Sequence, residues 1–164
     1  MKVREVTPTA DCSALLAGAQ FADAYAVAID DRALDALRAA EKMFARNPPW
    51  LDGLLRLRNI LVAPFGLKTS GVNEPSNGRI IGLFPVLSET SDRLVAGFDD
   101  RHLDFRVVVD VARGQRVVAT TVVKTHNLLG RIYLALVLPF HRLIVRNMLQ
   151  RAFLQTATLP KARS

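Results

Sequence analysis

The sequence predicts an α+β protein in which an antiparallel sheet curls around a long C-terminal helix. The strand-like segments are grouped between residues 79 and 126 instead of alternating with helices, which argues against a parallel βαβ design. Two helix-like patterns precede this group. After it, residues 128–151 form helix-like sequence so apolar that other elements must cover it.

The length and composition of the chain indicate a single domain. With 164 residues, of which 50% are hydrophobic and 23% charged, the chain fits one globular domain with a sizeable core. We expect that domain over residues 1–164, with its core at about 11–156 and a flexible tail at 157–164. The single cysteine, Cys12, excludes an intrachain disulfide framework. Because the N-terminal residues also lack the apolar stretch of a secretory signal, we expect a cytoplasmic protein.

The first part of the chain predicts strands at residues 2–6 and 20–29. Between them, Asp11 can cap a short helical turn. Alternate residues of 20–29 are apolar, among them Tyr25, as expected for a strand with one buried face. Asp23 lies on the same face and breaks the pattern. The sequence identifies no partner for its carboxyl group.

Two shorter helices are predicted next. The first begins at Asp30-Asp31, carries an apolar stripe at helical spacing and ends before Pro48. The second covers residues 50–62, again with apolar residues at helical spacing. Residues 67–78 then have the composition of a loop.

Four strands follow this loop, at residues 79–87, 93–98, 102–112 and 115–126. Along 102–112, apolar residues alternate with charged ones, so the apolar face should meet the core. The sequence contains no internal repeat and no convincing linker, which supports a single domain.

The charge is distributed unevenly along the chain. All 15 acidic residues lie before Val111, whereas residues 111–164 carry nine Lys/Arg and no acid. This basic end could favour an anionic lipid, a nucleic acid or an anionic ligand, although solvation and the helix dipole explain part of it. The basic residues follow no recognition-helix pattern, so we expect no specific nucleic-acid partner.

The C-terminal helix contains a nearly uncharged apolar run at residues 132–140. This run is shorter than the roughly 20 residues that span a bilayer. We therefore expect no transmembrane segment and interpret the run as part of a buried core helix.

Four segments have a distinctive order and spacing: WLDGLLRLRN at 50–59, PFGL at 64–67, GFDDRHLDFR at 97–106 and THNLLGRIYLALVLPFHR at 125–142. Together they resemble the bacterial domain-of-unknown-function family 2867. The resemblance implies a helix-grip fold like that of the START-like lipid-transfer and polyketide-cyclase superfamily. Some relatives carry this domain behind a nucleotide-sugar-epimerase-like reductase domain, but this chain has no G-x-G-x-x-G, and we expect no cofactor. Because the family has no assigned activity, the resemblance implies no catalytic residue.

The register of the last strand pair decides which basic side chains face the core. If residues 113–114 form a two-residue turn, Phe105 faces Val122, and Lys124 and His126 point inward. A change of register by one residue points both of them outward. The sequence leaves both registers open.

One arc of the C-terminal helix should line the cavity or the core. Its members lie at helical spacing: Tyr133, Val137, Phe140, Ile144 and Met148. Beside this arc, His141 is either a hydrogen-bonded structural histidine or a group that binds a ligand or transfers a proton. Pro139 predicts a kink in the helix.

The leading hypothesis is that an apolar or amphipathic small molecule binds in a cavity between the sheet and the C-terminal helix. The candidate ligand-binding residues are Tyr133, His141, Lys124, Tyr25, Val137 and Phe105. One alternative is a cyclase or isomerase on the same fold, with a His or Tyr as general acid/base. The other is a basic module that contacts a protein or a membrane surface. The three histidines lie on different elements without metal-ligand spacing, so we expect no metal site.

Overall fold

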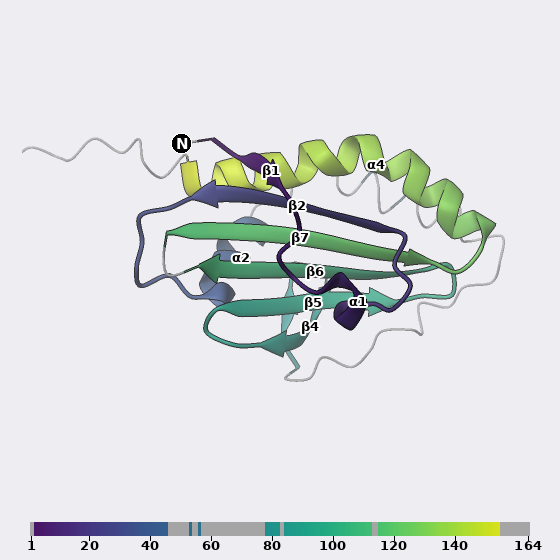
Figure 1. The fold of residues 1–164 in the computed structure, drawn as a ribbon, viewed down its shortest axis with the longest axis horizontal. Coiled ribbons are helices and arrows are strands. Elements are labelled where there is room, and N and C mark those ends of the chain that lie inside the picture. Colours follow the sequence, from purple (N-terminus) through teal and green to yellow (C-terminus); the bar gives the residue numbers. More distant parts are fainter. Residues whose placement is uncertain are drawn as a thin grey trace, which may run out of the picture.

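The computed structural model describes residues 2–45, 53, 56, 78–82, 84–112 and 115–154, which form an α+β fold. Its centre is a curved antiparallel sheet with the strand order β1-β2-β7-β6-β5-β4-β3 (Figure 1). The strands are β1 (Arg4–Val6), β2 (Phe21–Ala28), β3 (Ile80–Ile81), β4 (Phe84–Glu89), β5 (Arg93–Asp99), β6 (Leu103–Ala112) and β7 (Arg116–Thr125). The α+β class and the grouping of the strands are confirmed, and the arrangement is consistent with a helix-grip fold.

The helices lie on both sides of this sheet. They are α1 (Cys12–Leu15), α2 (Ala36–Phe44) and α4 (Leu128–Leu149), and α4 continues into the π-helical turn η2 (Gln150–Leu154). Figure 1 shows α1 in front of the sheet, α2 behind it and α4 along the edge formed by β1 and β2. The expected cap of α1 is confirmed, because the Asp11 side chain accepts the backbone N–H groups of Ser13 and Ala14.

The helix that follows β2 begins later than its sequence predicts. Asp31 accepts the backbone N–H of Ala33 in a turn, and Asp35 caps α2 by accepting the N–H of Arg38. Two capping aspartates four positions apart therefore divide the segment into a turn and a helix. The predicted start at Asp30-Asp31 is wrong for this reason.

The core lies on the face of the sheet that meets α2 and the end of α4. Odd-numbered residues of β2, β6 and β7 point toward this face, as do even-numbered residues of β5 and, on β4, Phe84 and Val86. They pack against the last turns of α4, where Ile144, Val145, Met148 and Leu149 are buried. The predicted alternation along 102–112 is confirmed, since Leu103, Val107, Val109 and Val111 are buried.

The register of β6 and β7 corrects one prediction. Ala112 faces Arg116, so three residues separate the strands instead of two, and Phe105 faces Val123. The extra residue shifts the register by one, which turns Lys124 and His126 to the face opposite the core. The inward orientation considered for Lys124 is therefore wrong.

The interpretation of α4 as a buried core helix is wrong for one of its faces. Leu128, Ile132, Leu136, Phe140 and Leu143 are 46–71% exposed. Phe140, which was expected to line the cavity or core, is among them. The physical reason is the placement of α4 along the sheet edge, where its main contacts with the described strands are with β2 and β7 (Figure 1).

Several predictions concern residues that the structure does not describe. The helix at 50–62 and the loop at 67–78 lie almost entirely outside the described residues. The turn at 113–114 and the tail at 157–164 lie wholly outside them.

Candidate functional site

A buried aspartate–histidine pair joins β2 to α4. The Nε2 atom of His141 lies 3.2 Å from Oδ1 of Asp23, and the two side chains are 14% and 7% exposed. The ring of Phe21 packs edge-on against the His141 ring, with centroids 6.0 Å apart and planes at 84°. Asp23, the residue that broke the apolar pattern of its strand, thus faces the core because α4 supplies a partner.

Two polar atoms beside this pair are buried without a partner. Oδ2 of Asp23 and the hydroxyl of Tyr25 form no hydrogen bond with the described residues. The two residues are two positions apart on β2 and therefore share one face of the sheet. Burial, followed by the nearby carboxyl groups of Asp23 and Glu5, raises the pKa of Tyr25 above its usual value of 10.0. The phenol stays protonated at neutral pH and can donate a hydrogen bond.

An aromatic cluster lies on the same face of the sheet. The rings of Phe84, Phe98 and Phe105 have centroid separations of 5.0 to 6.0 Å, and all three side chains are half-buried. In the strand register, Phe105 lies two strands away from Asp23 across the sheet and two residues away from it along the strand direction. Strand and residue spacings then put these two residues about 12 Å apart in a flat sheet. Polar and aromatic groups thus share one face of the sheet.

The six candidate residues are only partly brought together. Tyr25, Phe105 and His141 all belong to the side of the sheet that meets α2 and the end of α4. Tyr133 and Val137 are half-buried in the first half of α4. Lys124 lies on the opposite face, opposite Asp104. The sequence missed Asp23 as the partner of His141, although the break in alternation was a signal that it faces inward.

The family of the chain follows from the comparison with family models. The model described as "Protein of unknown function (DUF2867)" matches residues 15–148. The chain belongs to the DUF2867 family. This confirms the family resemblance, and the matched region includes both Asp23 and His141. No curated protein and no solved structure matches this DUF2867 chain.

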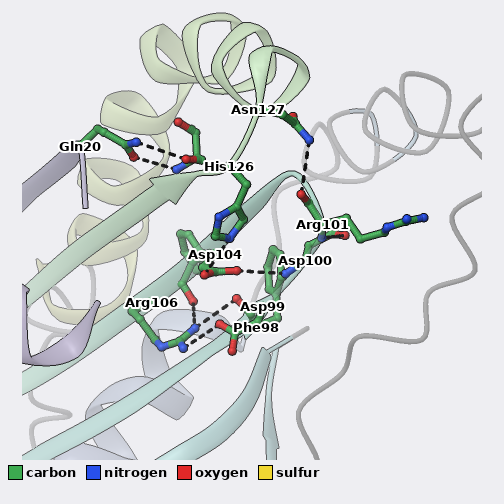
Figure 2. A network of polar contacts seen from close by, with 11 residues as sticks. Gln20, Phe98, Asp99, Asp100, Arg101, Asp104, Arg106, His126 and Asn127 are labelled. Atoms are coloured by element: carbon green, nitrogen blue, oxygen red, sulfur yellow. Dashed lines mark hydrogen bonds and ion pairs between the residues drawn. The ribbon is translucent and has the colours of Figure 1, made fainter. Parts of the chain in front are cut away.

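The other face of this DUF2867 domain carries a polar network around the start of α4, shown in Figure 2. His126 Nε2 lies 2.9 Å from Oδ2 of Asp104, and Arg106 pairs with Asp99 at 2.7 Å. The side chain of Gln20 continues the sheet ladder through two hydrogen bonds to the backbone of Thr125. These contacts hold β6, β7 and the chain before β2 together.

The first turn of α4 is fixed by a cap and a close backbone approach. Asn127 accepts the backbone N–H of Gly130 and donates to the carbonyl of Arg101. A Cβ atom at Gly130 would clash with the carbonyl oxygen of His102, so only glycine fits this turn. Because the contacts of this cap are with backbone groups and a neighbouring side chain, we assign the first turn of α4 a structural role.

No metal centre is present among the described residues, since no group of three or more His, Cys, Asp or Glu side chains could hold an ion.

An open groove of about 450 Å³ lies on the solvent side of α4. It is lined by Pro139, Arg142, Leu143, Arg146, Asn147 and Gln150.

Proposed function

We propose that this DUF2867 protein binds an apolar or amphipathic small molecule between the sheet and α4. The observation that supports this most is that two buried polar atoms, Oδ2 of Asp23 and the hydroxyl of Tyr25, have no hydrogen-bond partner in the part of the chain that the structure describes. Each buried polar atom left without a hydrogen bond costs about 1–3 kcal/mol. A ligand that satisfies both atoms would remove that cost, which makes the position a natural place for its polar group.

The chemistry of these atoms favours a ligand hydroxyl group. Oδ2 of Asp23 is an acceptor, whereas the protonated phenol of Tyr25 can donate. A hydroxyl group can donate to the first and accept from the second at once. A carboxylate offers only acceptors and cannot satisfy the Asp23 oxygen. We therefore propose a long-chain alcohol, sterol or phenol rather than a fatty acid.

The apolar part of such a ligand would extend toward Phe84, Phe98 and Phe105. These rings are half-buried among the described residues, so their exposed surface gains from contact with a hydrocarbon. The distance of about 12 Å between Asp23 and Phe105 suits a linear chain or a fused ring system.

The test compares 1-dodecanol, dodecanoate and dodecane by native mass spectrometry and calorimetry. We expect 1-dodecanol to bind at least about tenfold more tightly than either analogue, the equivalent of one hydrogen bond to a buried charged or polar group. In the double variant Asp23→Val/His141→Leu, which replaces the polar pair by apolar side chains, the preference for the alcohol should disappear.

The matched control is the double variant Asp104→Val/His126→Leu, since this pair lies on the opposite face. It should retain the preference for the alcohol. Equal binding of all three probes, or a crystal structure in which ordered waters satisfy Asp23 and Tyr25 and side chains fill the space, would contradict the proposal.

General acid–base catalysis is the second candidate function. The hydrogen bond between Asp23 and His141 fixes the orientation of an imidazole, as a carboxylate does for catalytic histidines. A general base of this kind would exchange the α-protons of an apolar ketone with solvent deuterium. Proton NMR of 2-undecanone in D₂O should show exchange with the wild type and none with His141→Gln. Exchange no faster than in buffer would exclude this function for ketones.

A further inference from the structure

The outer face of α4 carries a continuous apolar stripe. It consists of Leu128, Ile132, Leu136, Phe140 and Leu143, which are 71%, 46%, 48%, 54% and 59% exposed. Their spacing of three or four residues places them within an arc of about 120° around the helix. Five exposed apolar side chains on one face of a helix indicate a surface that contacts a partner.

The stripe belongs to a helix with the length and composition of a membrane segment. Residues Leu128–Leu154 form 27 residues of continuous helix, yet only 17% of its most apolar 18-residue window is buried. A core helix of a soluble protein can have the same composition, but it is mostly buried. Low burial therefore separates the stripe from an ordinary core helix.

The opposite face of α4 excludes a membrane-spanning arrangement. Ile144, Val145, Met148 and Leu149 belong to the core of the sheet, and His141 bonds to Asp23. A spanning helix would have to leave these contacts and expose both partners. The helix can keep them only if it lies along a surface.

Positive charges border the stripe. Arg131, Arg142 and Arg146 are exposed along one side of it, and α4 contains no acidic residue. Arg142 and Arg146 also line the open groove of about 450 Å³ together with Leu143 and Pro139. Guanidinium groups beside apolar side chains match a lipid phosphate above its acyl chains.

We infer that α4 lies flat on an anionic phospholipid bilayer. The stripe enters the boundary between headgroups and acyl chains, and Arg142 and Arg146 meet the lipid phosphates in the groove. A second copy of the chain is a poorer partner for this surface, because stripe-to-stripe pairing would gather arginines on helices that carry no acid. The inference is independent of the proposed ligand.

The test is flotation of the purified protein with vesicles of phosphatidylcholine, with and without phosphatidylglycerol. We expect binding to the anionic vesicles, weakened but not abolished by high salt, because the apolar contribution is not screened. The variant Ile132→Asp/Leu136→Asp should lower partitioning at least about tenfold, since it replaces two inserted side chains by charges. The control is Ile80→Asp, an isoleucine on β3 that is more exposed (61%) than Ile132 or Leu136, and this variant should bind as the wild type does.

Folding of each variant is checked by far-UV circular dichroism. If the double variant does not fold, Phe140→Asp at the centre of the stripe replaces it. Three outcomes would overturn the inference: no binding to anionic vesicles, undiminished binding of the stripe variants, and an equal loss in Ile80→Asp. Light scattering that shows a dimer abolished by the stripe substitutions would assign the surface to a second copy instead.

Discussion

Loss of the imidazole of His141 should lower the free energy of unfolding substantially, even though Phe140 and Arg142 on either side of it in the chain are exposed. In His141→Ala, the Asp23 carboxyl group keeps no hydrogen-bond partner among the described residues on either oxygen, because Oδ2 already has none there. Removing one member of a buried pair costs about 3–5 kcal/mol when the other is left charged. The side chains are 14% and 7% exposed, so some water reaches the pair, and we expect a loss near the lower limit, about 3 kcal/mol.

The assay is urea unfolding followed by circular dichroism, arranged as a double-mutant cycle with Asp23→Ala. The coupling energy should be about 2 kcal/mol, within the range for residues in direct contact. Asp23→Val/His141→Leu should be within about 1 kcal/mol of the wild type or more stable, because neither member of the pair is left behind without the other.

The control cycle uses Asp104 and His126. Their atoms are closer, at 2.9 Å, but the side chains are 15% and 35% exposed. We expect their coupling energy to be below about 1 kcal/mol, since solvent screens exposed pairs. A larger coupling for this pair than for Asp23 and His141 would refute the reasoning, because it would show that distance rather than burial decides the strength.

Two further predictions test single features. Tyr25→Phe should raise the unfolding free energy by about 1 kcal/mol at neutral pH, because it removes a buried hydroxyl without a partner. Burial raises the pKa of Tyr25, so the unfolded state ionises first and stability falls above about pH 10; this fall should be smaller in Tyr25→Phe. Gly130→Ala should destabilise the fold by about 2 kcal/mol, because the new methyl group meets the carbonyl of His102. The control is Gly53→Ala, where no atom lies within 4 Å of the added methyl group and the free energy of unfolding should not fall. An increase in the free energy of unfolding in both variants would contradict the clash at Gly130.

The fold was largely predictable because its signals are local. Alternation of apolar and polar residues predicted the strands, and Asp11 predicted the start of α1. The register of β6 and β7 was not predictable, because it depends on whether the loop between them has two or three residues. That one-residue difference turns every side chain of β7 to the opposite face, and the sequence does not determine the loop length. The exposure of α4 was not predictable either, since apolar periodicity shows that a face is apolar but not which surface covers it.

The candidate site shows the same limit at the level of single residues. The sequence indicated that Asp23 faces inward and that His141 needs a partner, but these residues are separated by 118 positions. Only tertiary structure could join the two observations. A polar residue that breaks an apolar pattern is thus a signal for a buried partner elsewhere in the chain, and a histidine of unassigned role is the first place to search for it.

The two surfaces of α4 make the two proposals separable. His141 points to the sheet, while Arg142 and the stripe point to solvent, so a substitution on one face leaves the other in place. If the bilayer supplies the ligand, Ile132→Asp/Leu136→Asp should slow transfer of 1-dodecanol from vesicles to the protein. Its affinity for dissolved 1-dodecanol should not change, because Ile132 and Leu136 are exposed and precede His141 by at least five positions on α4. A fall in the affinity for the dissolved alcohol would show instead that the stripe supports the site from within the fold.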